Sequence, residues 1–76
     1  MNIEEIKVLI ENAIIDAEVI VSSDDNVHFE AIIISDLFLD KNSIQRHQMV
    51  YKSLGNKMDS EIHALSIKTL TRDENN

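Results

Sequence analysis

The chain has 76 residues, which is the length of one small domain. Its 14 acidic and 7 basic side chains give a formal net charge of −7, which disfavours non-specific attraction to nucleic-acid phosphates. It contains no cysteine, which excludes a disulfide, a thiol nucleophile and a thiolate metal ligand.

The beginning of the chain predicts neither a signal peptide nor a membrane anchor. Glu4 and Glu5 stand where a signal peptide carries basic residues, and no long apolar stretch follows them. The longest apolar runs, such as 31–34, are far too short to cross a bilayer. We therefore expect a soluble, cytoplasmic protein without a membrane partner.

Residues 3–15 predict an amphipathic helix. Asn2 is the expected N-cap, and the acidic side chains of the first turn interact favourably with the helix dipole. The apolar residues that recur at three- and four-residue spacing, and so form one stripe, are Ile3, Ile6, Ile10, Ala13 and Ile14.

A β-hairpin is predicted next, because residues 18–21 and 27–35 are rich in β-branched side chains and 22–26 have turn chemistry. Alternation places one set of second-strand side chains on the same face, namely Val27, Phe29, Ala31 and Ile33. His28 and Glu30 point to the other face, which we expect to be partly in contact with water.

A second helix is predicted after a loop at 36–42, with Ser43 as its cap and Gly55 as the left-handed residue beyond its end. Its predicted apolar stripe consists of Ile44, His47, Tyr51 and Leu54, with Val50 beside it. A short helical turn is expected at 56–60, a third strand at 62–70 and a polar, frayed tail at 71–76.

The order of these elements predicts an α+β fold in a single domain that covers residues 1–76. Two helices can cover one face of a three-stranded sheet, so we expect a two-layer αββααβ arrangement with a mixed sheet.

Several segments, taken in order, resemble the BolA-like family. They are His-Phe-Glu-Ala at 28–31, Ser-Asp-Leu-Phe at 35–38, Gln-Arg-His-Gln-Met-Val-Tyr at 45–51 and Ile-His-Ala-Leu-Ser-Ile-Lys-Thr-Leu-Thr at 62–71. The resemblance covers the chain from about residue 3 to residue 74. The chain departs from the family where Asp40 replaces the glycine of a Phe-x-Gly-Lys motif, and its tail lacks the family's proline and tryptophan.

The resemblance implies a fold related to the class II KH domain and a role as a non-catalytic adaptor. Proteins similar to this one pair with a monothiol glutaredoxin and share a [2Fe–2S] cluster with it, in iron–sulfur cluster assembly and trafficking or in iron and redox sensing. The family's invariant ligand corresponds to His63. A second ligand comes from the loop between the first two strands, where His28 is the candidate and Asp25 the alternative.

The missing cysteines bear on this implied site. Fe–S clusters need thiolates, so the glutaredoxin and glutathione would have to supply them, and the isolated, monomeric chain is expected to hold no cluster. His47 lies beside Arg46 on the predicted apolar stripe, and we expect a hydrogen-bonded imidazole that ties the helix to the sheet.

Nucleic-acid binding is the alternative function, as a transcriptional regulator of stress response and cell morphology that uses the KH-like fold. The candidate contacts are Lys41, Arg46, Lys52 and Lys57. The acidic charge, the few aromatic side chains and the missing Gly-x-x-Gly loop oppose DNA as a partner, and a solvated helix face is expected instead. No nucleophile–base pair, phosphate loop or zinc motif predicts an enzyme.

Overall fold

The structure is a computed structural model that describes residues 2–56 and 64–76. Its first element, α1 (Ile3–Ala13), begins where the Asn2 side chain accepts a hydrogen bond from the Glu5 backbone N–H at 2.9 Å. Ile14 follows with a non-helical φ of −115°, so the helix ends at Ala13 and not at residue 15. The side chains of Ile6 and Ile10 are fully buried, as their spacing predicts.

The predicted hairpin is present and consists of β1 (Glu18–Ser22) and β2 (Phe29–Ile34), which pair antiparallel. Phe29, Ala31 and Ile33 are buried on one face of β2. Val27 does not join them: its side chain is 59% exposed because β2 begins only at Phe29 and Val27 belongs to the turn.

A short 3-10 helix, η1 (Asp36–Phe38), occupies part of the predicted loop and buries the Phe38 side chain. The next helix, α2 (Ser43–Leu54), is capped by Asn42 and not by Ser43. The Asn42 side chain accepts a hydrogen bond from the Gln45 N–H while the Gln45 side chain accepts one from the Asn42 N–H. This reciprocal pair is a capping box.

The buried face of α2 differs from the predicted stripe. Val50 and Leu54 are buried, whereas Ile44 is 70% exposed and Tyr51 is 37% exposed. Arg46, four residues before Val50, lies on the same side of the helix as Val50. Its side chain donates hydrogen bonds to the backbone carbonyls of Phe38 and Lys41. The helix is therefore rotated away from the phase that its apolar residues suggest.

Gly55 ends α2 with a positive φ of +58°, as predicted. Its ψ of −135° lies outside the left-handed helical region, however, so the expected left-handed conformation is not the one adopted. Such a backbone conformation is accessible mainly to glycine.

The last strand, β3 (Leu65–Leu70), pairs parallel with β2, in a register that sets Phe29 opposite Leu65 and Ile34 opposite Leu70. The sheet order is β1-β2-β3, and the sheet is mixed, as expected. The first predicted residues of this strand, 62 and 63, lie outside the described residues, and only Asn56 of the turn predicted at 56–60 is described.

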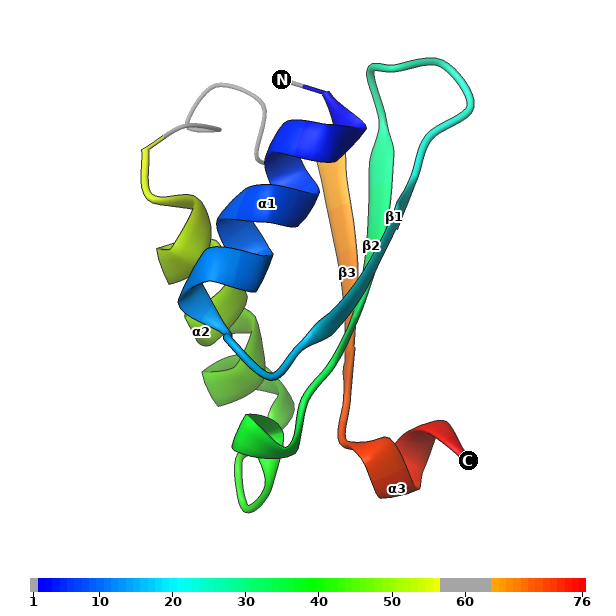
Figure 1. Ribbon diagram of the computed structural model, residues 1–76. Helices are drawn as coiled ribbons and strands as arrows, with labels where there is room; N and C mark the ends of the chain where they lie inside the picture. Colours follow the sequence, from blue (N-terminus) through cyan, green and yellow to red (C-terminus); the bar gives the residue numbers. More distant parts are fainter. Residues whose placement is uncertain (1, 57–63) are drawn as a thin grey trace.

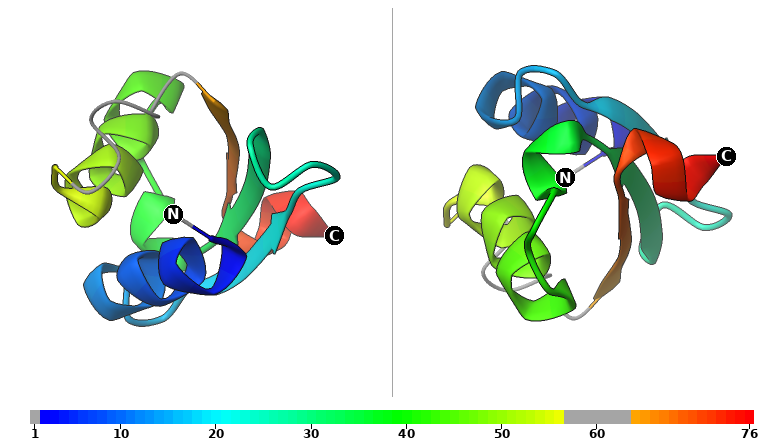
Figure 2. Two further views of the ribbon diagram at one scale, coloured as in Figure 1. Left: turned by 90° about the horizontal axis from the view of Figure 1, so that it is seen from above. Right: turned by 90° about the horizontal axis from the view of Figure 1, so that it is seen from below.

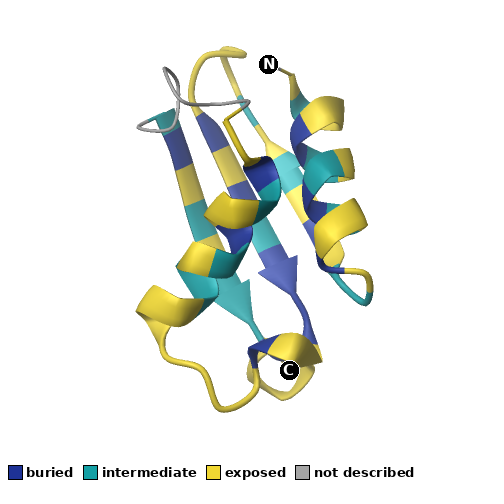
Figure 3. Ribbon diagram, turned by 90° about the vertical axis from the view of Figure 1, so that its left-hand side faces the viewer, coloured by how far each residue is buried: buried dark blue, intermediate teal, exposed yellow. Residues whose placement is uncertain are grey.

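Helices α1 and α2 cover the same face of the sheet, which confirms the two-layer α+β arrangement (Figures 1 and 2). Buried and exposed positions alternate along the strands (Figure 3). The largest buried side chains of the core are Phe29, Phe38, Ile6, Ile10, Ile33, Leu54 and Val50. Among the described helices, none has both the length and the apolar character of a membrane-spanning segment.

The end of the chain is ordered and not frayed. A single helical turn, α3 (Arg72–Asn75), follows β3 at the end of the sheet (Figure 1). The Thr71 hydroxyl accepts a hydrogen bond from the Glu74 N–H, and the Glu74 carboxylate accepts one from the Thr71 N–H at 2.8 Å. The polar composition that suggests fraying thus supplies a second capping box.

We expect Phe29→Ala to lower the free energy of unfolding by about 3–5 kcal/mol, because it leaves a cavity between the sheet and the helices. Phe29 is 1% exposed, whereas Val27, two positions earlier, is 59% exposed. Val27→Ala is the matched control and should change stability by less than about 0.5 kcal/mol. Urea denaturation measures both. A loss of stability in Phe29→Ala no larger than that in Val27→Ala would show that Phe29 is not part of the core.

Candidate functional site

The loop between β1 and β2 is organised by the side chains of Ser23 and Asp25. Asp25 Oδ1 accepts hydrogen bonds from the backbone N–H groups of Val27 at 2.9 Å and His28 at 2.8 Å. Ser23 Oγ accepts one from the Asn26 N–H at 2.9 Å and donates one to the His28 carbonyl at 2.6 Å. Short polar side chains thereby satisfy the backbone of this turn, in which Asn26 has a positive φ of +59°.

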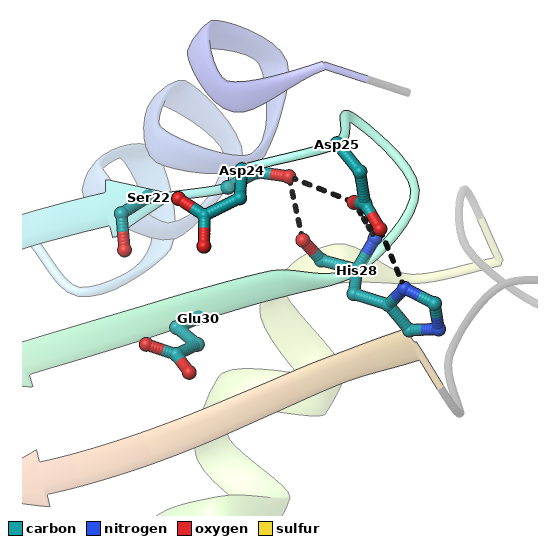
Figure 4. Close-up of a pocket in the computed structure, with 6 residues that line it drawn as sticks. Ser22, Asp24, Asp25, His28 and Glu30 are labelled. Carbon is teal, nitrogen blue, oxygen red and sulfur yellow. Dashed lines mark hydrogen bonds and ion pairs between the residues drawn. The ribbon is translucent and has the colours of Figure 1, made fainter.

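His28 and Asp25 form a direct side-chain pair at this loop. The imidazole Nδ1 lies 2.9 Å from Asp25 Oδ2, and the ring presents Nε2 away from the carboxylate (Figure 4). The hydrogen bond from the His28 ring, and after it the backbone N–H groups of His28 and Val27, hold the pKa of Asp25 well below its usual value. The His28 side chain is 75% exposed, so a partner can reach its ring.

A shallow hollow surrounds this pair. Its lining residues, which Figure 4 draws at the loop between β1 and β2, are Ser22, Ser23, Asp24, Asp25, His28 and Glu30. Three of the six are acidic, which gives the hollow a negative charge. Within residues 2–56 and 64–76, no three histidine or acidic side chains gather in a metal-binding group.

Of the two candidate ligands, His28 is among the described residues and His63 is not. His28 directly precedes Phe29, the first residue of β2, and belongs to the loop. Its side chain is therefore oriented by Asp25 and not by the strand alternation that the sequence suggests. His63 lies outside the described residues; in the sequence it precedes Leu65, the first residue of β3, by two positions.

His47 is half-buried on α2. Its ring packs edge-on against Tyr51 of the same helix, with ring centroids 6.5 Å apart and planes at 90°. The hydrogen bond that was expected to tie this imidazole to the sheet is absent among the described residues. Its observed contact lies within α2, between residues four positions apart.

Arg46 is not presented as a nucleic-acid contact, because its guanidinium is engaged within the protein. Nε donates to the carbonyls of Phe38 at 3.1 Å and Lys41 at 2.9 Å, and both terminal nitrogens donate to Glu74, at 2.6 and 3.2 Å. The side chain is only 13% exposed. The bidentate bond to Glu74 raises the pKa of Arg46, and the same bond followed by the Thr71 N–H lowers the pKa of Glu74 to about 2.

Two of the other candidate contacts, Lys41 and Lys52, do lie together. With Gln45, Gln48 and Met49 they line a shallow hollow on the exposed face of α2. Lys57 lies outside the described residues. Of the four basic residues singled out in the sequence, the structure therefore groups two.

A polar cluster at the opposite end of the sheet is not apparent from the sequence. Ser35 is fully buried and its hydroxyl donates to Asp16, which also accepts from the Asp36 N–H at 3.1 Å and from Arg72 Nη1 at 3.1 Å. The hydrogen bond from Ser35, with further contributions from Arg72 and Asp36, lowers the pKa of Asp16. The cluster joins the loop after α1 to the end of β2 and the start of α3. It is structural.

Comparison with known proteins gives consistent matches. The sequence profile of the family described as BolA-like protein matches residues 4–74. The solved structure of a bolA protein homologue from Coxiella burnetii is 40% identical and has a TM-score of 0.84, with 99% of this chain and 96% of that chain covered.

Two curated relatives match over shorter segments. The DNA-binding transcriptional regulator BolA of Escherichia coli is 34% identical over 44 residues, which are 58% of this chain and 42% of the relative. The chloroplastic protein BOLA1 of Arabidopsis thaliana is 40% identical over 52 residues, which are 68% of this chain and 32% of the relative. The matched segments thus cover less than half the length of these two relatives.

The pair formed by Arg46 and Glu74 predicts a pH-dependent contribution to stability. The pKa of Glu74 is about 2 in the folded chain, against an ordinary value of 4.5, so the pair stabilises the fold above pH 4.5 and stops doing so as the pH falls toward 2. We expect Glu74→Gln to lower the Tm by a few degrees at pH 7 and to have a much smaller effect near pH 2, where about half of the Glu74 carboxyl groups are protonated.

Thermal melts across this pH range measure the difference. Asp73→Asn is the matched control, because it removes the same charge from the same helical turn and Asp73 has no ion pair among the described residues. A Tm loss in Glu74→Gln that is the same at both pH values would contradict the assigned pair.

Proposed function

This chain belongs to the BolA-like family, and on that premise we propose that it is a non-catalytic cytoplasmic adaptor that binds a monothiol glutaredoxin and shares a [2Fe–2S] cluster with it. The complex would serve iron–sulfur cluster assembly and trafficking, or the sensing of iron and redox state. The observation that supports this most is the imidazole of His28, which is exposed in the loop between β1 and β2 and is hydrogen-bonded through Nδ1 to Asp25.

The residues present fit such a ligand role. A metal-binding histidine ordinarily donates its second ring N–H to a carboxylate or a carbonyl, and Asp25 supplies that acceptor at 2.9 Å. The chain has no cysteine, so the glutaredoxin and glutathione must supply the thiolates that the cluster requires. The cluster, when bound, supplies one-electron redox chemistry and an iron–sulfur unit for transfer.

His63 is proposed as the other ligand from this chain. Phe29 and Leu65 are paired in register, so the loop that carries His28 and the start of β3 lie at the same end of the sheet. His63 precedes Leu65 by two positions in the sequence.

The use of imidazoles has a chemical consequence for the proposed complex. A neutral imidazole in place of a thiolate removes negative charge from the cluster, which raises its reduction potential. Because an imidazole must be neutral to bind iron, His28 and His63 would also make the cluster sensitive to acid. Both properties are suited to a cluster that is handed on or that reports redox state.

DNA binding as a transcriptional regulator is a second candidate. The Escherichia coli relative carries that function in its name, and Lys41 and Lys52 line one hollow with Gln45 and Gln48. The bidentate engagement of Arg46 by Glu74 and the net charge of −7 count against it. We therefore place it behind the adaptor function.

The ligand assignment predicts a spectral difference between histidine variants in the complex with the glutaredoxin. We expect His63→Ala to change the visible circular dichroism of the shared cluster and to speed its loss, and His28→Ala to give a smaller change of the same kind. His47→Ala is the matched control and should retain the wild-type spectrum, because His47 packs on Tyr51 within α2. A wild-type spectrum and cluster lifetime in His63→Ala would contradict its role as ligand.

A salt titration separates the two candidate functions. We expect the isolated chain to show no saturable binding to duplex DNA near physiological salt. Two phosphate contacts from Lys41 and Lys52 would instead give a log–log slope of about −2, and Lys52→Ala would reduce its magnitude by about one. Binding with that slope and that response would favour the regulator, and fluorescence anisotropy at several salt concentrations measures it.

A further inference from the structure

We propose that Asp25 is a positioning residue that determines which nitrogen of His28 is available as a ligand, an inference that rests on the adaptor function proposed above. The carboxylate lies 2.9 Å from Nδ1 of the ring, and Nε2 points away from it (Figure 4). In this arrangement Asp25 holds the neutral imidazole with its proton on Nδ1 and leaves the lone pair on Nε2.

The chemistry of the two side chains requires this assignment. An ionised carboxylate can only accept hydrogen bonds, so the ring nitrogen that faces it must carry a proton. A neutral imidazole has one N–H, and once Nδ1 carries it Nε2 has the free lone pair. The opposite tautomer would set the Nδ1 lone pair against the carboxylate of Asp25, which is unfavourable.

The carboxylate is itself held in place independently of the ring. Its Oδ1 accepts the backbone N–H groups of Val27 and His28, at 2.9 and 2.8 Å, which leaves Oδ2 directed at the imidazole. Ser23 bonds to the backbone of both Asn26 and His28 and so holds the loop that carries these groups. The orientation of the acceptor therefore comes from the loop backbone, before any cluster is bound.

The Asp25→Asn substitution provides a specific test of this arrangement, because the side-chain amide has one acceptor and one donor group. Its carbonyl oxygen can still accept the two backbone N–H groups, which places the amide nitrogen toward the ring. That nitrogen is a donor, so Nδ1 of His28 would have to accept a hydrogen bond and the ring proton would move to Nε2. Asp25→Asn should thus preserve the loop and invert the tautomer.

Asp24→Asn is the matched control for the loss of charge. Asp24 lines the same hollow and neighbours Asp25 in the sequence, and among the described residues its carboxylate makes no hydrogen bond to the His28 ring. The variant therefore removes one negative charge near the imidazole without altering the acceptor at Nδ1.

The tautomer can be measured on the full, ¹⁵N-labelled chain without a cluster, by long-range ¹H–¹⁵N correlation at about pH 9, where ordinary imidazoles are neutral. His28→Ala assigns the signals. We expect a protonated Nδ1 and an unprotonated Nε2 in the wild type and in Asp24→Asn, and the reverse in Asp25→Asn. A protonated Nε2 in the wild type, or an unchanged ring in Asp25→Asn, would overturn the inference.

The same variants in complex with a monothiol glutaredoxin separate this inference from the proposed function. With the tautomer inverted, Asp25→Asn should change the cluster's visible circular dichroism as His28→Ala does. If the tautomer inverts but His28→Ala leaves the spectrum unchanged, the proposed ligand role of His28 fails while the control of the ring by Asp25 stands. If His28→Ala changes the spectrum and Asp25→Asn alters neither ring nor spectrum, the positioning role is overturned and the ligand role stands.

Discussion

The parallel pairing of β2 with β3 aligns Phe29 with Leu65 and makes both strands begin at one end of the sheet. Parallel neighbours need a crossover connection, and α2 provides part of it while covering the same face as α1 (Figure 1). The loop between β1 and β2 lies at that same end, because it leads into the start of β2. The loop that carries His28 is thereby set beside the start of β3, and the proposed site depends on this juxtaposition.

The two ends of the sheet are stabilised in different ways. At the end where β2 and β3 finish, the buried hydroxyl of Ser35 bonds to Asp16, and Arg46 clamps Glu74 of α3 in a bidentate pair. At the other end, Asp25 organises the loop through backbone N–H groups and leaves the His28 ring 75% exposed. The contacts at the first end stabilise the fold. At the second end, the His28 side chain is oriented by Asp25 and remains exposed.

The elements that depend on local pattern could be predicted from the sequence, since the spacing of Ile6 and Ile10 and the alternation of Phe29 and Ile33 report burial directly. The inner face of α2 could not, because Arg46 occupies it through a partner 28 residues away, Glu74. That same distant contact orders the polar C-terminal segment. Turn chemistry at 22–26 was evident, but not that Asp25 orients the imidazole, which depends on the folded loop. His63 is implied by the family resemblance alone.

We propose that this chain contributes imidazoles, and no thiolates, to a cluster that only a complex can hold. The most direct measurement is anaerobic co-purification with the cell's monothiol glutaredoxin, followed by visible absorption and iron counting of the isolated chain and the complex. We expect a cluster in the complex and no iron on the chain alone. A stoichiometric iron–sulfur chromophore on the isolated chain, or a glutaredoxin that does not bind the chain, would contradict the shared cluster.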